Sequence, residues 1–485
     1  MFQLNELPFP FTARQYINGS WCNAANGKTW SVINPATEQS VIEVPFGDDK
    51  DCRAAIEAAE IAFKSWSRMN PFERGAILKK ASAIIHERLN EYAKVTVLES
   101  GKPLIEAIGE WRVAANFFEW YAEEGKRGLG SVIAANRNNK RMSVIHQPMG
   151  VVGAITAWNF PAYNPARCWS AALGAGCTVV AKVSEYTPLT GILLAQCLHD
   201  AGLPPGVLNI VNGIPAKIGE EMLNNPKIRK ISFTGSTRVG KILMDGASKN
   251  IKRLALELGG NAPVIIFPDI DVKKVAEESV IAKLRNAGQV CIAPQRYIVH
   301  ESIHKQFVEF AAAKMEKIKV GNGLDTATEM GPMINSVQRE NLERLVSQSK
   351  AAGADIITGG ARGNDSGFFF QPTLLQPKSL DNPALQNEIF GPVMPVISFK
   401  TEEEAIQLAS STQYGLASYL WTNDLKTSIR VSEQIEFGMV GINEWYPQAF
   451  EAPFGGWKQS GLGYECGRDG LEEYQEKKLI SLGGL

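Results

Sequence analysis

Short β-branched segments alternate with helical segments from Met149 onward, and this alternation restricts the possible folds more than any other feature of the chain. The strand-like segments are GVVGAITAW, CTVVAKV, GVLNIVNG, KISFTGS and RLALELG, and the helical segments between most of them cover residues 161–173, 188–201, 216–224 and 237–248. A parallel sheet with crossover helices has this pattern. We therefore predict an α/β fold with a doubly wound, Rossmann-like nucleotide-binding domain, whose ligand lies beyond the carboxyl ends of the strands.

A similar alternation begins again after Gly260, in the strand-like segments APVIIF, QRYIVH, DIITGG and PVMPVISF. A second α/β domain is the simplest interpretation of this second series. Before Met149, apolar residues at helical spacing predict helices over residues 51–66, 72–100 and about 105–126.

Two strand-like segments, RMSVIHQPMG and KKLISLGGL, have no obvious partner nearby in the sequence. Segments of this kind often become edge strands that are shared between subunits. They therefore favour a homo-oligomer, either a dimer or a tetramer.

Composition and charge exclude several classes of protein. The 485 residues carry a net charge of −1 without a lysine or arginine block that could follow a phosphate backbone, so we expect no nucleic-acid partner. The N-terminus has no targeting leader and no apolar stretch reaches membrane-spanning length, so we expect a cytoplasmic protein without a membrane partner. The seven cysteines include no C-x-x-C pair, which argues against a disulfide framework and against a metal site.

The segment NAGQVCIAP places a single thiol, Cys291, between a Gly-Gln step and a proline. A free cysteine is most often a small core residue, so a nucleophilic role needs support from elsewhere in the chain. Glu257 lies in ALELGG among apolar neighbours, and burial there would raise its pKa toward the range of a general base. None of the five histidines lies in a glycine-bounded motif at a strand end, which leaves glutamate as the expected base.

Two motifs at strand ends are suited to a dinucleotide. Gly235 and Ser236 open a helix in FTGSTRVG, where the backbone could approach a pyrophosphate, although an ordinary turn would use the same residues. Lys182 and Glu185 follow the strand CTVVAKV, where both could bind a ribose or simply form an ion pair with each other. A carboxylate at Glu185 would repel a 2′-phosphate, so the functional interpretation predicts NAD over NADP.

Six motifs follow one another along the chain: AWNFPAYNPARCWSAALGAGCTVVAKVSEYTP, FTGSTRVGK, LELGGNAPVII, GQVC, NEIFGPVMPV and PFGGWKQSGLG. Together they resemble the aldehyde dehydrogenase superfamily, from about residue 15 to the C-terminus. The resemblance implies a cofactor domain (residues 1–127 and 149–258), a catalytic domain (259–440) and a small β oligomerisation arm (128–148 and 468–485). It also implies oxidation of a small-molecule aldehyde, with NAD as the cofactor and NADP as a second possibility.

The same resemblance assigns roles to the matching positions. Cys291 would attack the aldehyde, Glu257 would activate the water that hydrolyses the thioester, and the side-chain amide of Asn159 would join the Cys291 N–H in an oxyanion hole. The residues expected around the dinucleotide are Trp158, Lys182, Glu185, Gly235, Ser236, Leu258, Glu388 and Phe390.

Arg167, Arg285 and Gln448 bear on the choice of aldehyde. Both arginines match positions with which succinate-semialdehyde dehydrogenases hold the substrate carboxylate, a planar anion that suits a guanidinium group. Taken singly, each arginine could be a surface or helix-capping cation. Together they favour an aldehyde that carries a distal carboxylate, with succinate semialdehyde as the expected substrate. Gln448 matches a third contact position that is often serine, which leaves another dicarboxylic semialdehyde or a sulfonated aldehyde open.

Two other functions remain open at this point. The first is oxidation of a neutral aliphatic or aromatic aldehyde, which is favoured by the aromatic residues Trp445, Tyr446 and Phe450 in the expected substrate loop. A catalytically silent relative that serves as a binding protein is the other alternative, and the intact set of Cys291, Glu257 and Asn159 argues against it.

Overall fold

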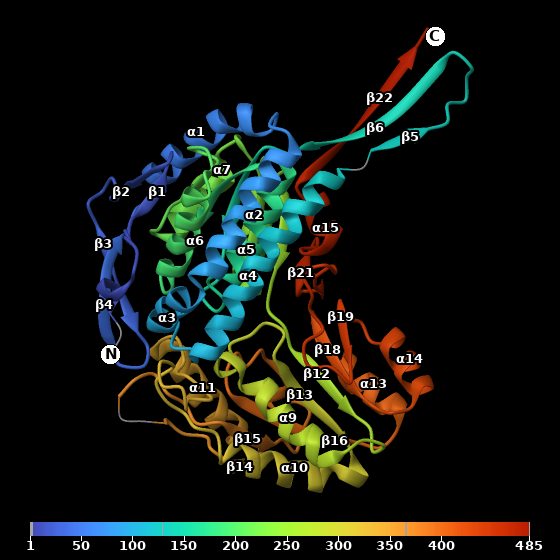
Figure 1. The fold of residues 1–485 in the computed structure, drawn as a ribbon. Helices are drawn as coiled ribbons and strands as arrows, with labels where there is room; N and C mark the ends of the chain where they lie inside the picture. The colour runs from blue at the N-terminus through green and yellow to red at the C-terminus, as the bar shows by residue number, and fades with distance from the viewer. Residues whose placement is uncertain (1–2, 129, 364–365, 485) are drawn as a thin grey trace.

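The computed structural model describes residues 3–128, 130–363 and 366–484. Residues 1–2, 129, 364–365 and 485, which fall within the predicted cofactor domain, arm and catalytic domain, lie outside the described residues. The described chain forms two large sheets surrounded by helices, together with a narrow three-stranded extension (Figure 1). The predicted α/β fold class is confirmed.

Eight strands form the first sheet, in the order β2-β1-β9-β8-β7-β10-β11-β21. The strands from β9 to β11 in this order are parallel and correspond to the five predicted segments. β1, β2 and β21 are antiparallel additions at the edges. The bounds are β1 (Gln15–Ile17), β2 (Ser20–Cys22), β7 (Val151–Ile155), β8 (Thr178–Lys182), β9 (Leu208–Ile210), β10 (Ile228–Thr234), β11 (Arg253–Glu257) and β21 (Gly461–Leu462).

Helices cover both faces of this sheet. Apolar side chains of α1, α7 and α8 form one buried cluster on one face. On the other face α5 and α6 contact the strands, and α2, α3 and α4 pack outside them, so the sheet is doubly wound as predicted. The bounds are α1 (Asp49–Trp66), α2 (Pro71–Glu87), α3 (Leu89–Ser100), α4 (Leu104–Glu124), α5 (Tyr163–Ala175), α6 (Pro188–Asp200), α7 (Pro215–Asn224) and α8 (Thr237–Ser248).

The single helix predicted over residues 72–100 is wrong, because the structure has two helices there. α2 ends at Glu87 and α3 begins at Leu89, since Arg88 between them has a ψ of 18°, outside the helical range. The Arg88 guanidinium donates to Asp200 at the end of α6, at 2.8 Å. This contact joins segments that are distant in the chain, so apolar spacing alone does not reveal the turn.

Seven strands form the second sheet, in the order β14-β15-β16-β13-β12-β18-β19, and all neighbours are parallel except β14 and β15. The strands are β12 (Ala262–Ile266), β13 (Pro294–His300), β14 (Asp355–Thr358), β15 (Thr373–Gln376), β16 (Val393–Phe399), β18 (Ala417–Trp421) and β19 (Met439–Ile442). The helices are α9 (Val272–Leu284), α10 (Glu301–Met315), α11 (Ser336–Ala351), α12 (Pro383–Gln386), α13 (Glu402–Ser410) and α14 (Leu425–Gln434). β15, β18 and β19 were not predicted.

A three-stranded arm projects away from both sheets (Figure 1). β6 (Lys140–Pro148) pairs with β22 (Gln475–Gly483) along its whole length, and β5 (Ser131–Ile133) pairs with the other edge of β6. The two strand-like segments without an obvious partner are therefore each other's partners within one chain. α15 (Gly467–Glu472) leads into β22.

The remaining short elements were not predicted from the sequence. They are the hairpin β3 (Thr29–Asn34) and β4 (Gln39–Pro45), the pair β17 (Tyr414–Gly415) and β20 (Trp457–Lys458), and the turns η1 (Leu4–Glu6), η2 (Gly125–Arg127) and η3 (Arg285–Gly288). Among the described residues, no helix combines the length and the apolar character that crossing a membrane requires.

Candidate active site

One cavity of about 700 Å³ lies beyond the carboxyl ends of β7, β10 and β11, against loops and helix α11 of the second α/β half. This is the position expected for the ligand of a doubly wound sheet. Its wall contains every residue predicted for the site except Lys182 and Glu185: Trp158, Asn159, Arg167, Gly235, Ser236, Glu257, Leu258, Arg285, Cys291, Glu388, Phe390 and Gln448.

Cys291 lies on the loop between α9 and β13, whose backbone is unusual. The turn η3 precedes it and contains non-glycine residues in the left-handed region, among them Asn286 with a φ of 50°. Gly288 has a φ of 72°, and a Cβ there would lie 2.2 Å from the Gly391 carbonyl oxygen. Because only glycine tolerates both the conformation and the close approach, Gly288 determines how the loop presents the thiol.

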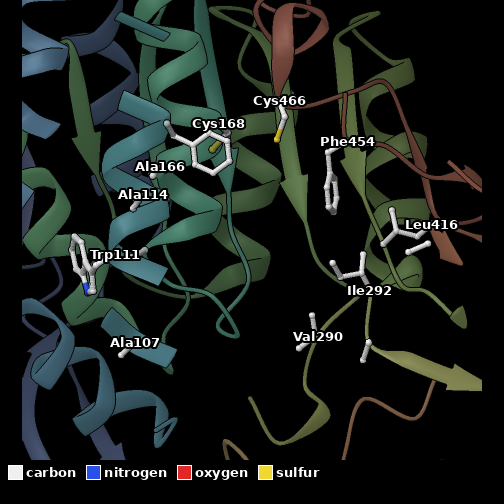
Figure 2. Close-up of a cluster of buried hydrophobic side chains, with 14 of the residues drawn as sticks. Ala107, Trp111, Ala114, Ala166, Cys168, Val290, Ile292, Leu416, Phe454 and Cys466 are labelled. Atoms are coloured by element: carbon white, nitrogen blue, oxygen red, sulfur yellow. The ribbon is translucent and has the colours of Figure 1, made fainter. Parts of the chain in front are cut away.

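The Cys291 side chain is half-buried and lines the cavity, so it is not a sealed core residue. Its neighbours Val290 and Ile292 are buried, and Figure 2 shows them in the same apolar cluster as Phe454. Burial raises the pKa of the thiol to about 12, and the Arg167 cation partly opposes this shift. The thiol is therefore neutral near pH 7 in this structure, and its attack on a carbonyl requires removal of the proton.

The side-chain amide of Asn159 is oriented by two hydrogen bonds. Its Nδ2 donates to the Gln289 carbonyl oxygen at 3.1 Å, and its Oδ1 accepts from Asn164 Nδ2 at 3.2 Å. An amide nitrogen carries two hydrogens, and only one of them is used here. Asn159 can thus offer its second N–H to a ligand oxygen while it remains tied to the loop of the nucleophile.

Glu257 ends β11 and is only 3% exposed. Burial raises the pKa of its carboxyl group well above the usual range, Arg167 lowers it in part, and Glu465 raises it further. Its Oε2 atom has no hydrogen-bond partner within the described part of the chain. The direction of the pKa shift agrees with the expectation from the sequence, and the carboxyl group is placed to exchange a proton in the cavity.

Arg167 on α5 is buried and already paired. Its Nε forms an ion pair with Glu465, and both side chains are at most 4% exposed. Its Nη2 donates to the Thr234 hydroxyl at 3.4 Å, and the guanidinium lies 4.6 Å from the centroid of the Phe454 ring. The positive charge of Arg167 is therefore largely compensated within the protein.

Arg285 differs from Arg167 because its guanidinium has no ion pair and no hydrogen bond in the described ranges. It lies 5.4 Å from the ring centroid of Phe160 and 5.2 Å from that of Tyr446. The Oε1 atom of Gln448, another wall residue, is buried without a hydrogen-bond partner among the described residues. The cavity wall thus carries a cation without an ion pair among the described residues, which interacts only at longer range with the Glu106 carboxyl group, and a polar amide.

The part of the wall near α8 suits a phosphate group. Gly235 and Ser236 precede this twelve-residue helix, and the Ser236 hydroxyl accepts from the Val239 N–H at 3.4 Å. A Cβ at Gly240 would lie 2.6 Å from a methyl carbon of Leu258, so the absence of a side chain lets α8 pack closely on the residue after β11. Unpaired N–H groups at a helix N-terminus bind anions, which is what a pyrophosphate requires.

Other residues of the wall offer a fixed carboxyl group and an aromatic surface. Glu388 Oε1 accepts from the Gly260 N–H at 3.0 Å, and burial raises the pKa of this carboxyl group to about 7. A Cβ at Gly259 would lie 2.5 Å from Glu388 Oε2. Trp158 and Phe390 meet edge to face with ring centroids 5.5 Å apart. These groups, with the N-terminus of α8, fit a dinucleotide that has phosphates, hydroxyl groups and flat rings.

Lys182 and Glu185 form an ion pair of 2.5 Å at the carboxyl end of β8. The Thr156 N–H donates to the Lys182 carbonyl at 3.1 Å, which places the pair one strand away from Trp158. An ion pair is one of the two interpretations of this motif, and a contact with ribose stays a prediction.

The aldehyde dehydrogenase family model matches residues 21–480, nearly the whole chain. The chain belongs to the aldehyde dehydrogenase family. It is 41% identical to a succinate-semialdehyde dehydrogenase [NADP(+)] of Escherichia coli, over 98% of each chain, and 42% identical to a glutarate-semialdehyde dehydrogenase of Pseudomonas putida, over 97% of this chain and 98% of the relative. The solved structure of a succinate-semialdehyde dehydrogenase from Burkholderia pseudomallei matches with a TM-score of 0.97 and 41% identity, covering 99% of this chain and 100% of that chain. The predicted family and architecture are confirmed.

Three acidic residues in or beside the site of this aldehyde dehydrogenase were not predicted. Glu106 and Glu110 of α4 line the cavity, and Glu465 pairs with Arg167. Glu110 shares the buried face of α4 with Trp111, so a charged residue on an apolar helix face was the signal. Glu465 gave no such signal, because its partner is distant in the sequence. Within the described ranges, no group of three or more His, Cys, Asp or Glu side chains could hold a metal ion.

Proposed function

We propose that this aldehyde dehydrogenase oxidises an aldehyde with a distal carboxylate, such as succinate semialdehyde, to the corresponding acid with NAD or NADP. The observation that carries the proposal is Arg285, a cation with no ion-pair partner in the described chain, in the wall of the cavity that also contains Cys291. The names of the relatives above support the same class, and glutarate semialdehyde belongs to it.

The first step forms a bond between Cys291 Sγ and the carbonyl carbon. The thiol first loses its proton to solvent, and as the S–C bond forms the π electrons of the carbonyl group move onto its oxygen. The second N–H of Asn159 and the backbone N–H of Cys291 would hold this oxyanion, and one preorganised donor typically lowers the barrier by about 3 kcal/mol. Since the pKa of Cys291 is raised to about 12, proton removal is part of the cost of this step.

A dinucleotide bound in the cavity would supply the hydride acceptor. The residues that would hold it are Gly235 and Ser236 before α8 and, elsewhere in the wall, Trp158, Leu258, Glu388 and Phe390, with Lys182 and Glu185 at the ribose. Loss of a hydride from the carbon attached to Cys291 would leave a thioester, which has the same oxidation level as the carboxylic acid product.

Glu257 would complete the reaction by taking a proton from water as the water oxygen attacks the thioester carbon. The C–S bond then breaks, the acid leaves and the sulfur of Cys291 recovers a proton. A carboxyl group with a raised pKa is a stronger base than an exposed one once it is ionised, and Arg167 helps to stabilise the ionised form.

Arg285 would be the principal clamp for the substrate carboxylate, and Arg167 a secondary one. A substrate carboxylate would have to share Arg167 with Glu465 in a close ion pair, whereas Arg285 forms no ion pair in the described chain and only interacts at longer range with the charge of Glu106. A charge-assisted hydrogen bond to a guanidinium is among the strong interactions available to a carboxylate. Gln448, whose Oε1 is buried and unpaired among the described residues, would add a polar contact.

We infer a preference for NAD over NADP from Glu185, because its carboxylate would repel the additional phosphate of NADP. The ion pair with Lys182 reduces this repulsion without removing it, so weak activity with NADP is compatible with the proposal.

A panel of kcat/KM values tests the proposal. Succinate semialdehyde, glutarate semialdehyde, butanal and benzaldehyde are each oxidised with NAD and with NADP, and the absorbance of the reduced nicotinamide is recorded. The proposal expects both semialdehydes to exceed butanal, which has the same chain length as succinate semialdehyde but no carboxylate. A higher value for butanal or benzaldehyde would favour the alternative of a neutral aldehyde, which the rings of Phe160 and Tyr446 beside Arg285 also suit.

We further propose that the arm joins copies of the chain into a homo-oligomer in the cytoplasm. Its side chains Val132 (91% exposed), Leu479 (59%) and Leu482 (55%) are apolar, and such surface is usually covered in solution. The mass in solution, measured by light scattering, tests the oligomer.

The proposed domain boundaries are the predicted ones. The cofactor domain covers residues 1–127 and 149–258, the catalytic domain 259–440, and the arm 128–148 and 468–485. β21 links the last part of the chain to the first sheet.

A further inference from the structure

Lys102 and Glu110 form a buried ion pair outside the catalytic motifs. Their side chains are 0% and 1% exposed, and Lys102 Nζ lies 2.5 Å from Glu110 Oε2. Lys102 follows α3 and Glu110 lies on α4, in the helical layer that covers the first sheet. Burial of two charges is costly, and a buried ion pair is weak evidence for added stability, so its contacts need a separate explanation.

Lys102 reaches the turn that carries the oxyanion donor. Its Nζ donates to the Asn159 carbonyl oxygen at 2.8 Å and lies 4.3 Å from the centroid of the Phe160 ring. The lysine therefore holds the backbone of the same residue whose side-chain amide faces the cavity.

Glu110 holds the other end of the same turn. Its Oε1 accepts from the backbone N–H groups of Ala162 and Tyr163, at 2.7 and 3.1 Å. These groups lie at the start of α5, which has no capping side chain at its own N-cap position. Although Glu110 reaches the cavity wall, both of its oxygen atoms are used, one by Lys102 and one by the two N–H groups.

A third contact links this turn to the loop of the nucleophile. Asn286 Nδ2 donates to the Asn159 carbonyl oxygen at 2.9 Å and to the Gln289 carbonyl oxygen at 3.2 Å. The Asn159 carbonyl therefore accepts one bond from the Lys102 side and one from the Cys291 side. Its position relative to the sulfur depends on both.

We propose that Lys102 and Glu110 are positioning residues that hold the turn of residues 159–163, so that the second N–H of Asn159 points to the oxygen of the intermediate on Cys291. This inference rests on the proposed function, because it needs the oxyanion. Neither residue donates or accepts a proton in the reaction; they act through Asn159.

The variant Lys102→Met removes the ammonium group and keeps most of the side-chain volume. A displacement of about 1 Å in a reacting group lowers a rate by on the order of 100-fold, so we expect a loss of that size in hydride transfer. The rate is measured as the pre-steady-state burst of reduced nicotinamide, and a deuterated aldehyde identifies the hydride step. KM for the aldehyde and Kd for NAD should change little, because the residues assigned to them are untouched.

A double-mutant cycle with Asn159→Ala separates positioning from a general structural role. If Lys102 acts through Asn159, Lys102→Met slows hydride transfer in the wild-type background and adds nothing further in the Asn159→Ala background. The matched control is Lys230→Met, which removes another fully buried lysine from an ion pair, with the half-buried Glu473, away from the cavity wall. Lys230→Met should lower the unfolding midpoint and leave the burst rate unchanged.

The proposal is overturned if the effects of Lys102→Met and Asn159→Ala multiply, or if Lys102→Met slows the burst no more than Lys230→Met does. Should Lys102→Met fail to fold, Glu110→Gln replaces it in the same cycle, because glutamine keeps an acceptor for the two N–H groups and loses the charge. An unchanged burst rate in that variant would also overturn the proposal. The cycle is run with whichever aldehyde the wild-type enzyme oxidises fastest, so a wrong substrate class and a wrong role for the ion pair give different results.

Discussion

Replacement of Arg285 by methionine should remove the preference of the enzyme for aldehydes that carry a carboxylate over neutral aldehydes. The guanidinium has aromatic neighbours and no ion pair in the described chain, so the substitution breaks no internal salt bridge. Methionine keeps an unbranched apolar stem, although it lacks the guanidinium that contacts the rings of Phe160 and Tyr446. We therefore expect the free energy of unfolding to change little, and the loss to appear in the handling of the substrate carboxylate.

The expected size of that loss follows from the contact that disappears. A hydrogen bond between charged groups contributes about 1.5–3 kcal/mol. With about 1.36 kcal/mol for each factor of ten, kcat/KM for succinate semialdehyde should fall roughly 10- to 150-fold. Butanal has no carboxylate, so its kcat/KM should remain close to the wild-type value. The ratio of the two constants then falls by the whole factor.

Steady-state kinetics with both aldehydes measure this ratio at saturating cofactor. Arg344→Met is the matched control, since Arg344 is an exposed arginine that lines the same cavity from α11. The control should leave the ratio of the two kcat/KM values unchanged. An equal loss with butanal and with succinate semialdehyde in Arg285→Met would refute the reasoning, because it would show that Arg285 does not act on the carboxylate.

Three other perturbations test different parts of the site. Glu257→Gln should release one burst of reduced cofactor and then stall at the thioester, and steady turnover at the wild-type rate would remove Glu257 from the role of base. Activity should rise from neutral to alkaline pH, because burial raises the pKa of both Cys291 and Glu257 and each group acts in its ionised form. The ionised form is lost as the pH falls below the pKa. A flat profile of kcat against pH would contradict this expectation. Arg167→Met leaves Glu465 buried without its ion-pair partner, so urea denaturation should show that the free energy of unfolding falls by about 3–5 kcal/mol. The double variant with Arg167→Met and Glu465→Leu should recover most of this loss.

The central strands of the first sheet could be predicted because their pattern is local. A buried parallel strand is a short β-branched run, and it remains recognisable without its neighbours. β1 and β2 have three residues each, which is too short for such a pattern to show. The break at Arg88 escaped prediction for a different reason, because the apolar spacing continues through it and the non-helical backbone of Arg88 appears only in the structure.

For the predicted site residues as well, one property could be predicted from local sequence and another could not. The types needed for the chemistry, a thiol, a carboxyl group and an amide, could be recognised at Cys291, Glu257 and Asn159 from their motifs. The state of each group could not, because the pKa of a side chain depends on its burial and on charges that other segments bring near it.

The sequence by itself determined the α/β alternation and the family motifs, and it predicted which groups react. Only the tertiary structure decided which arginine forms an ion pair, since Glu465 meets Arg167 through folding and no residue in the described chain forms an ion pair with Arg285. It also decided that Lys102 and Glu110, from helices outside the motifs, hold the turn of Asn159. The physical reason is that backbone pattern is encoded over a few neighbouring residues, whereas charge pairing and desolvation depend on distances between segments that only the packed core brings together.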